Sequence, residues 1–597
     1  MLDIEDLCSD ATSRRQTTLR GCVDFLTKQD ISTEKEYSIA HRKMMRKYKI
    51  SAKKSELLNV LQTEYDASER QVSNLRPYLI KKKKKSLSGV LVITVLTSPY
   101  PTDDKGKKQT FSCKWNCYYC PNEPGQPRSY LKDEPAVSRA NRFDFCPKKQ
   151  FNGRVSRLRD NGHPVDKIEL LVLGGTWASY PKSYQLQFCR DLYYSANTFW
   201  DSEKREPYTI EEEQRINESA RTKIIGLTLE TRPDCINPTE LRLFRKYGCT
   251  RVQLGVQHTS NDILQRINRG HDVNASIQAI EMLLNNCFKV DIHLMPDLPG
   301  SSFEKDREMF STILYSSKFR ADQLKIYPHS VVPWTVTKKW FEDGTFVPMS
   351  ASDLMENILW FKTRVHPWIR LNRIIRDIPT QYISGGNMIP NLRQDMHKEM
   401  KRRGVSCDCI RCREIGDAVA ECCERVVRSY KASHGTEYFI SYEDTKNNKI
   451  IGFIRVRITK YAGAIRTSGK RTFIFPELKE CALIRELHVY GKLIPTDQRK
   501  RTQTTTQTTT QHTGLGRKLL TEAMNIALLH GRRRIAVIAG VGTRNYYRRY
   551  GFEHTGRGAY MVKSITFFEA CRILVRKHYH IIIGLIVVGL AVHTYRY

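Results

Sequence analysis

Short apolar runs recur between residues 89 and 326 of the chain, separated by longer stretches with helical spacing. The first run, Gly89–Thr97 (GVLVITVLT), is rich in β-branched residues and is typical of a buried parallel strand covered on both faces. Repeated strand, loop and helix units of this kind predict an α/β fold, a partial (β/α) barrel. The other predicted strands are Lys167–Leu173, Lys223–Leu229, Arg251–Val256, Val290–Met295 and Gln323–Ile326.

A second pattern of strands begins at Glu437. Its predicted strands are Tyr438–Tyr442, Ile450–Ile458, Ala482–Tyr490 and Arg534–Ala539. The charged run around Cys422 and Cys423 is predicted to be helical, with both thiols as ordinary residues. We therefore divide the chain into a basic helical segment at 1–88, a barrel at 89–375, a connecting region at 376–430, a second domain at 431–565 and a tail at 566–597.

Two stretches look like additions to these domains. Residues 501–511 (RTQTTTQTTTQ) are polar and of low complexity, which predicts a mobile loop. Ile581–Val592 has no polar side chain, and eighteen residues separate Lys577 from Arg596, a borderline length for a membrane span. We favour a tail anchor in an organelle membrane, either the mitochondrial outer membrane or the endoplasmic reticulum, with the enzyme on the cytoplasmic face. The alternative is a helix packed on the second domain of a protein of the cytoplasm.

Charge narrows the choice of partners. The chain has 597 residues with 98 Lys plus Arg against 63 Asp plus Glu, a formal net charge of +35. This excess favours a polyanionic partner, nucleic acid first and an anionic membrane surface second. The basic run at 41–49 and the lysines at 81–85 either bind phosphates or are simply solvated. The 17 cysteines without a secretory signal favour a reducing compartment, with metal ligands and buried thiols rather than disulfides.

Three cysteines follow the first predicted strand at the spacing CxxxCxxC. Cys113, Cys117 and Cys120 can converge on one inorganic centre, and soft thiolates suit an iron–sulfur cluster or zinc. Three ligands on a 4Fe-4S cluster leave one iron open for S-adenosylmethionine. This spacing, with an aromatic residue before the last cysteine, is typical of radical S-adenosylmethionine enzymes. The alternatives are a zinc knuckle or three unrelated thiols.

Further candidates lie at the ends of the later strands. Gly174, Gly175 and Thr176 could let the backbone approach the methionine amino group, or form a plain turn. Glu230 and Arg232 are candidate contacts to S-adenosylmethionine, with ion pairing inside the barrel as the alternative. Lys325 could position acetyl or carboxylate oxygens, with a salt bridge as the alternative.

A second cysteine group lies in the connecting region. Cys407, Cys409 and Cys412 are close enough to share a structural zinc ion, which usually takes four protein ligands. His397 is the candidate for the fourth. The alternative is a set of buried free thiols.

A Gln-x-x-Gly-x-Gly turn precedes the helix of the second domain. Free backbone N–H groups at a helix N-terminus bind pyrophosphate, as in coenzyme A sites of acetyltransferases of the GNAT fold, with a Rossmann turn as the rival. Tyr546 and Tyr547 could protonate the leaving thiolate, or pack in the core. The residues of the turn are Gln511, His512, Thr513, Gly514, Leu515, Gly516 and Arg517.

Taken together, these motifs resemble the catalytic subunit of Elongator, a family of tRNA-modifying radical enzymes, from about residue 38 to 563. The resemblance implies a partial TIM-like barrel of radical S-adenosylmethionine type followed by a GNAT acetyltransferase domain. The matching stretches are SLSGVLVITVLTSPYP, GHPVDKIELLVLGGTWASYP, LTLETRPDCIN, YGCTRVQLGVQ, NRGHDV, MPDLPG, LKIYP, CDCIRCREIG, FISYED, IRELHVYG, QHTGLGRKLL and AGVGTRNYYRRYGF.

The resemblance implies carboxymethylation of carbon 5 of the wobble uridine in the tRNA anticodon stem-loop. A 5′-deoxyadenosyl radical from S-adenosylmethionine would take hydrogen from the methyl group of acetyl-CoA, and thioester hydrolysis would leave the carboxymethyl group. Glu486, Leu487, His488 and Val489 are implied as contacts to acetyl-CoA. Other Elongator subunits and a second copy of the chain are implied as partners. On this interpretation the cluster and the thioester share one cavity.

This sequence departs from the family pattern in one relevant place. Thr102–Ser112 separates the Pro-Tyr-Pro motif from Cys113, so Cys117 and Cys120 are the more secure ligands. The rival enzyme hypothesis is a protein lysine acetyltransferase acting on histone or tubulin, with the cluster only structural. A non-enzymatic alternative is a membrane-tethered tRNA-binding scaffold with degenerate sites.

Overall fold

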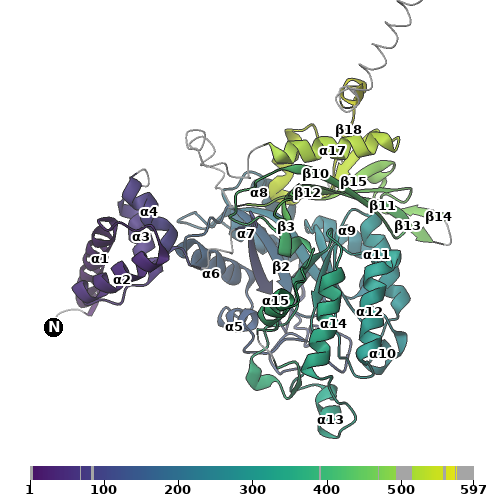
Figure 1. The fold of residues 1–597 in the computed structure, drawn as a ribbon, viewed down its shortest axis with the longest axis horizontal. Coiled ribbons are helices and arrows are strands. Elements are labelled where there is room, and N and C mark those ends of the chain that lie inside the picture. The colour runs from purple at the N-terminus through teal and green to yellow at the C-terminus, as the bar shows by residue number, and fades with distance from the viewer. Residues whose placement is uncertain are drawn as a thin grey trace, which may run out of the picture.

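The computed structural model describes residues 4–66, 69–81, 87–388, 391–467, 470–491, 514–555, 560–571 and 573. The N-terminal segment forms four helices to one side of the molecule (Figure 1). They have a hydrophobic core of their own, with Leu26, Leu57 and Leu75 buried in it. The helices are α1 (Ile4–Thr27), α2 (Glu34–Tyr48), α3 (Lys54–Glu64) and α4 (Arg70–Leu79).

Seven parallel strands form the first sheet, in the order β1-β2-β3-β4-β5-β6-β8. Each strand pairs with its successor along the chain, and the two outer strands do not pair with one another, so this sheet is a half-barrel. All six predicted strands of this region are present. The strands are β1 (Leu91–Leu96), β2 (Lys167–Leu173), β3 (Lys223–Thr231), β4 (Arg251–Gln257), β5 (Lys289–Leu294), β6 (Gln323–Ile326) and β8 (Arg370–Arg373).

Helices cover the outer face of the half-barrel (Figure 1). They are α5 (Pro135–Arg142), α6 (Pro147–Asp160), α7 (Lys182–Asn197), α8 (Ile210–Asn217), α9 (Pro238–Lys246), α11 (Val273–Asn285), α12 (Phe303–Tyr315) and α14 (Ala351–Arg364). Two shorter helices, α10 (Asn261–Arg266) and α13 (Val336–Glu342), pack instead beside the loop that carries Cys117. The connection to the second sheet contains α15 (Leu392–Arg402) and α16 (Ile410–Arg413), and β7 (Ser330–Val331) pairs with β9 (Gly385–Gly386).

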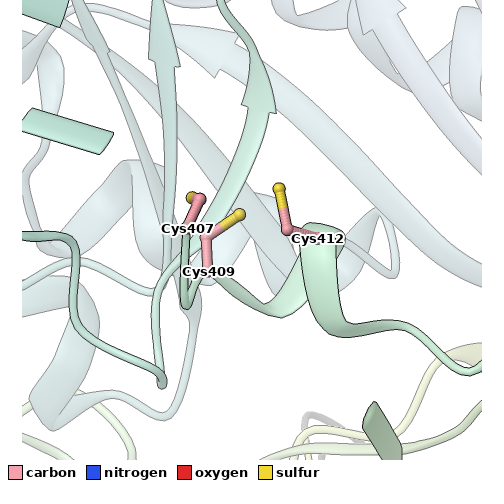
Figure 2. Close-up of side chains that lie close together, drawn as sticks. All are labelled: Cys407, Cys409 and Cys412. Carbon is pink, nitrogen blue, oxygen red and sulfur yellow. The ribbon is translucent and has the colours of Figure 1, made fainter. Parts of the chain in front are cut away.

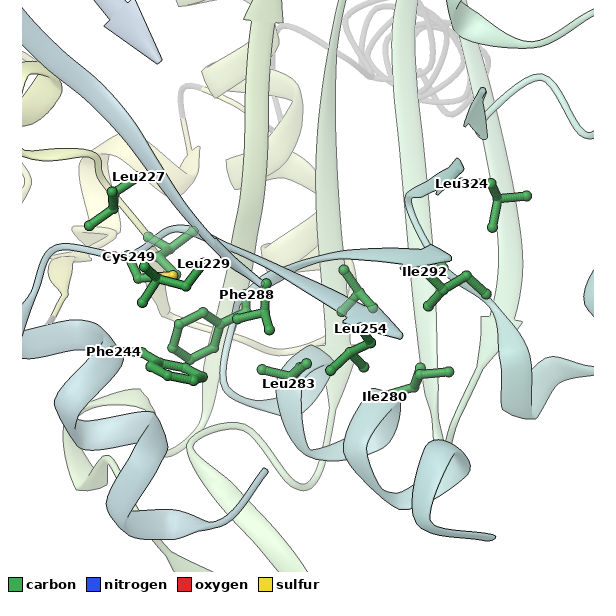
Figure 3. Packing of buried hydrophobic residues seen from close by; sticks show 14 of the residues in the cluster. Leu227, Leu229, Phe244, Cys249, Leu254, Ile280, Leu283, Phe288, Ile292 and Leu324 are labelled. Atoms are coloured by element: carbon green, nitrogen blue, oxygen red, sulfur yellow. The ribbon is translucent and has the colours of Figure 1, made fainter. Parts of the chain in front are cut away.

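The two faces of the half-barrel strands differ in polarity. Leu227, Leu229, Leu254 and Ile292 point outward into the hydrophobic core under the helices (Figure 3). Because side chains alternate along a strand, the residues between them point into the interior. In β3 these are Gly226, Thr228 and Glu230, so the interior is polar.

The second sheet has the order β10-β11-β12-β15-β16-β18-β17. Only β15 and β16 are parallel, and they pair over Cys481–Ile484 of β15 before they separate. The elements are β10 (Glu424–Ala432), β11 (Gly435–Asp444), β12 (Lys449–Thr459), β15 (Cys481–Val489), α17 (Leu515–Leu529), β16 (Arg534–Val537), α18 (Arg544–Arg548), β17 (Glu553–His554) and β18 (Met561–Ser564), with the hairpin β13 (Ala464–Thr467) and β14 (Lys470–Phe473) beside them.

The helix predicted around Cys422 and Cys423 is wrong. Both cysteines lie in the loop before β10, which pairs antiparallel with β11 from Glu424 to Ala432. The strand is at the edge of the sheet and carries charged residues on its exposed face, which hides the strand signal in the sequence.

Several predictions fall on residues outside the described ranges. These are the lysines at 82–85, the polar insert at 501–511 and the apolar stretch Ile581–Val592. No helix within the described part of the chain is long and apolar enough to cross a membrane. The tail anchor therefore stays a prediction.

Buried ion pairs join the two sheets. The Arg485 guanidinium on β15 donates to both carboxylate oxygens of Asp322, at 2.6 and 2.7 Å, and to Glu437 at 2.8 Å. Arg455 on β12 lies 3.6 Å from Asp322 and 3.0 Å from Glu486. Burial would raise the pKa of Asp322, but the two arginines outweigh it and hold that pKa at about 2.

Candidate active site

The three cysteines that follow β1 line one cavity of about 1410 Å³ at the C-terminal ends of the half-barrel strands. Their loop is held by contacts from distant segments. The Tyr118 N–H donates to the Ile267 carbonyl at 3.0 Å, and the Tyr118 carbonyl accepts from Val336 N–H at 3.0 Å. The loop therefore has a fixed position although it contains no helix or strand.

The thiols differ in their surroundings. Cys117 lies 3.4 Å from Arg232 Nη1 and 3.5 Å from Arg269 Nη1. A hydrogen bond from the Cys120 thiol, together with these arginines, lowers the pKa of Cys117 to about 4 despite its burial. The same contact with Cys117 raises the pKa of Cys120. Cys113 lies apart from this pair, with its Sγ 3.1 Å from Thr176 Oγ1. Three thiols on one cavity beside two guanidinium groups suit a 4Fe-4S cluster in which three of the irons each take one thiolate.

The Gly174-Gly175 turn packs against the cysteine loop. A Cβ atom on Gly175 would lie 2.5 Å from the Ser112 carbonyl oxygen, and one on Gly174 would lie 2.3 Å from Thr97 Oγ1. Both residues have positive φ angles, 120° at Gly174 and 85° at Gly175. Close packing and backbone conformation therefore require glycine here. Gly175 and Thr176 also line the cavity.

Glu230, Arg232 and Lys325 all line the same cavity, but they do not pair with one another. Arg232 donates to Asp234 at 2.9 Å and lies under the Trp115 ring, 4.2 Å from its centroid, next to the cluster thiols. Glu230 accepts from the Tyr130 hydroxyl at 3.3 Å. Lys325 donates to Gln253 Oε1 at 2.7 Å, and burial lowers its pKa.

A second, smaller cavity of about 150 Å³ lies between the half-barrel and the second sheet. The predicted contacts Glu486, Leu487, His488 and Val489 all line it, as does Tyr547. Its half-barrel side is formed at the N-terminal ends of the strands by Glu169, Gly226, Thr250 and Lys289, among others. The two cavities are separate, but they come close beside β1 and along β2, where Val90 and Glu169 line the second cavity and Val92 and Leu171 line the cysteine cavity. The expectation of one cavity shared by the cluster and the thioester stays a prediction.

Other residues of the predicted coenzyme site lie near the start of α17. Gly514 is the N-cap of this helix with a φ of 81°, Leu515 is buried, and Arg517 N–H donates to the Gly514 carbonyl at 3.0 Å. A Cβ atom on Gly516 would lie 2.4 Å from the Tyr546 hydroxyl. Gln511, His512 and Thr513 lie outside the described residues.

Cys407, Cys409 and Cys412 form the one group among the described residues whose metal-binding side-chain atoms all lie within 4.8 Å of one another (Figure 2). Hydrogen bonds from the Cys407 and Cys412 thiols lower the pKa of Cys409. The Lys362 ammonium lies 4.0 Å from Cys412 Sγ, which also favours thiolate. His397 is not part of this group.

Sequence reasoning missed Arg269 and the polar interior of the half-barrel. Arg269 follows α10 and contacts Cys117 from 152 positions away in the chain. The polar interior could have been predicted from the sequence. Polar and apolar residues alternate in Arg251–Gln257 and in Lys289–Leu294, which predicts strands with one polar face.

Comparison with known proteins agrees with this geometry. The chain matches the Radical SAM superfamily over residues 109–311 and the Radical SAM C-terminal domain over residues 321–402. It is 36% identical over 513 residues to a tRNA uridine(34) acetyltransferase of Methanocaldococcus infernus, covering 84% of this chain and 90% of that protein. It is 36% identical to Elongator complex protein 3 of Homo sapiens, covering 82% and 87%. The solved structure of the archaeal Methanocaldococcus infernus Elp3 with an N-terminal deletion has a TM-score of 0.66 and 34% identity, covering 80% and 100%.

Proposed function

Because the chain belongs to the family of Elongator complex protein 3 and the tRNA uridine(34) acetyltransferases, we propose that it modifies carbon 5 of the wobble uridine of tRNA. The product we propose is a carboxymethyl group built from acetyl-CoA. The observation that carries the proposal is the loop of Cys113, Cys117 and Cys120, which opens into a large cavity lined by basic residues.

The cysteine loop fits a 4Fe-4S cluster. Cys113, Cys117 and Cys120 would hold the cluster, and Arg232 and Arg269 beside Cys117 would balance its negative charge. Gly175, Thr176 and Glu230 would contact S-adenosylmethionine. When bound, the cluster and S-adenosylmethionine supply a 5′-deoxyadenosyl radical; the chain provides binding, orientation and exclusion of water.

RNA binding is supported by the basic lining that extends this cavity towards the N-terminal helices. Arg139 on α5 and Arg154 and Arg157 on α6 line it, and none of them forms an ion pair within the described ranges. Burial and repulsion from Arg154 and Arg157 lower the pKa of Arg139 to about 10. Like charges held together without an ion pair among the described residues favour a polyanion such as the tRNA backbone.

Replacing both Arg154 and Arg157 by alanine is expected to weaken tRNA binding on the order of tenfold and to reduce the salt slope of log K by about two. Filter binding at several salt concentrations measures both quantities. The matched control replaces Lys398 and Arg402 of α15, two exposed basic residues outside the cavity lining. Equal affinity of the two variants would exclude this surface as the tRNA site.

We propose that the second sheet is a GNAT acetyltransferase domain and that its cavity takes the acyl end of acetyl-CoA. The separation of β15 from β16 after Ile484 supports this, because Leu487 and Val489 then line the cavity without a strand partner on that side. Tyr547 would handle the acetyl group, and Tyr546 packs against the helix start through Gly516. Half-barrel side chains close one side of the cavity, which disfavours a lysine of another protein as acceptor.

We also propose that Cys407, Cys409 and Cys412 bind structural zinc, with a fourth ligand not contributed by His397. The three thiols are closely spaced, and thiolates are the ligands that structural zinc prefers. Replacing Cys409 by serine is expected to remove the zinc and to lower the midpoint of thermal unfolding by about 5 °C. Metal analysis and thermal melts measure this, with Cys423→Ser at an exposed thiol as control. Unchanged zinc content in Cys409→Ser would refute the site.

The function is tested by anaerobic reconstitution with iron and sulfide. The protein is then incubated with tRNA, S-adenosylmethionine, acetyl-CoA and a reductant, and the nucleosides are analysed by mass spectrometry. We expect carboxymethyluridine at the wobble position. Acetylated protein without this nucleoside would instead support the lysine acetyltransferase hypothesis.

A further inference from the structure

The two cavities are lined by different levels of the same strands. In β5, Lys289 lines the cavity at the second sheet and His293 lines the cysteine cavity. These two positions are four residues apart, which corresponds to about 13 Å of strand. β3 repeats the arrangement, with Gly226 at one cavity, Glu230 at the other and Thr228 between them. The linings come closest on β2, where Glu169 lines the second cavity and Leu171, two residues further along, lines the cysteine cavity. The interior of the half-barrel therefore joins the two sites.

We propose that this interior is a passage that receives the acyl arm of the thioester, entered from the second cavity and leading to the cysteine cavity. The proposal rests on the proposed function, since it assumes an acyl-CoA in the second cavity and a reacting centre in the first. Because the two cavities are separate, the acyl carbon needs a route to the cysteine cavity, and the passage provides one.

Hydrogen bonds connect the two ends without a gap. From the cysteine cavity, Lys325 Nζ donates to Gln253 Oε1 at 2.7 Å, and Gln253 Nε2 donates to Asp291 Oδ2 at 3.0 Å. Asn372 Nδ2 donates to the same Asp291 oxygen at 2.9 Å and to Gln323 Oε1 at 2.7 Å.

The second half of the chain passes through Arg251. Its Nη1 donates to Gln323 Oε1 at 2.7 Å and its Nε donates to Thr228 Oγ1 at 2.9 Å. Its Nη2 lies 2.6 Å from Glu169, which lines the second cavity. The Arg251–Glu169 pair stands at the entrance and must part for an acyl arm to enter.

The polarity of this interior is unusual for a barrel. Barrel interiors are ordinarily packed by layers of branched apolar side chains, and buried polar groups without partners are destabilising. Asp291 is fully buried, and its Oδ1 has no hydrogen-bond partner among the described residues. An acyl arm offers matching groups, because its amide N–H can donate to Asp291 Oδ1 and its thioester carbonyl can accept from Lys325.

The test places a thiol halfway along the passage. Thr228→Cys is made in the full-length protein, which is then treated with bromoacetyl-CoA; a thiolate within reach displaces bromide and forms a thioether. We expect the introduced thiol to be alkylated about tenfold faster than the thiol of Leu227→Cys, which points to the outer core. Peptide mass spectrometry measures the adduct, and excess CoA should suppress it.

Bromoacetamide, which has no coenzyme handle, reports whether the introduced thiol is accessible at all. Alkylation of Thr228→Cys by bromoacetamide but not by bromoacetyl-CoA would overturn the proposal. So would labelling by bromoacetyl-CoA that excess CoA does not reduce.

A second variant closes the entrance. A Cβ atom on Gly226 would meet Thr250 Oγ1 at 3.4 Å and Glu169 Cγ at 3.5 Å, so the backbone accepts a side chain that fills the cavity mouth. Adding Gly226→Leu to Thr228→Cys should lower the labelling about tenfold, whereas Gly226→Ala should lower it less.

In the reconstituted enzyme, Gly226→Leu should still form 5′-deoxyadenosine but little carboxymethyluridine. If this variant makes the nucleoside at the wild-type rate, the passage is refuted and the proposed function stands. If the wild type makes none, the proposed function itself fails.

Discussion

Replacing Cys117 by alanine is expected to abolish formation of the modified uridine, with a loss of at least about 1000-fold. Both Arg232 and Arg269 contact Cys117, and the pKa of this thiol is lowered to about 4 by its hydrogen bond with Cys120 and by the two arginines. Without this thiolate, only Cys113 and Cys120 remain to hold a cluster, and Cys120 loses the partner that fixes it. The iron content and visible absorbance of the reconstituted protein should fall together with activity.

Cys423→Ser is the matched control, because this thiol is exposed and lies outside both cysteine groups. It should leave iron content, tRNA binding and product formation unchanged. tRNA affinity should also survive in Cys117→Ala, since the basic residues of the cavity remain in place. Product formation by Cys117→Ala at more than a trace level would contradict the assignment of this loop as the cluster site.

Replacing Arg485 by alanine is expected to destabilise the junction between the two sheets by about 3 to 5 kcal/mol. Arg485 is fully buried and pairs with Asp322 and Glu437, which would be left as buried charges with fewer partners. Denaturant unfolding followed by fluorescence should show the junction separating at a lower midpoint. Arg402→Ala, which breaks an exposed pair with Glu399, should leave this transition in place.

A double variant distinguishes the loss of the Arg485–Asp322 ion pair from a general loss of packing. If the cost comes from uncompensated charge, combining Arg485→Met with Asp322→Asn should be less harmful than the sum of the two single changes. Simple additivity would show that the two residues act independently, contrary to the geometry.

The same network should make the junction sensitive to acid. The pKa of Asp322 is held at about 2, below the usual value of about 3.9 for an unfolded chain. A carboxylate with a lowered pKa contributes stability that is fully present above the unfolded value and is lost as the pH falls towards the folded one. Stability should therefore decline between about pH 4 and pH 2, and Asp322→Asn should flatten this decline.

Local sequence determined much of this protein. The β-branched runs predicted all six strands of the half-barrel that were proposed, because strand preference depends on a few adjacent side chains. The CxCxxC spacing brought three thiols within 4.8 Å of one another, and the CxxxCxxC spacing placed three thiols on one cavity, since only a few bonds separate the residues. The strand β10 was missed because its charged exposed face obscures the pattern.

The tertiary structure decided which groups meet across long separations. Arg232 contacts Cys117 from 115 positions away, and Arg485 pairs with Asp322 from 163 positions away. Sequence reasoning named Arg232 as a candidate contact to S-adenosylmethionine, with an ion pair as the alternative. It did not predict the contact with Cys117, because spacing along the chain does not reveal such partners. The placing of two cavities along one polar interior likewise depends on the register of seven strands, which local preference does not fix. Short-range covalent geometry determined the strands and the spacing of the thiols. Long-range packing determined which charged side chains pair with one another and how far apart the two cavities lie.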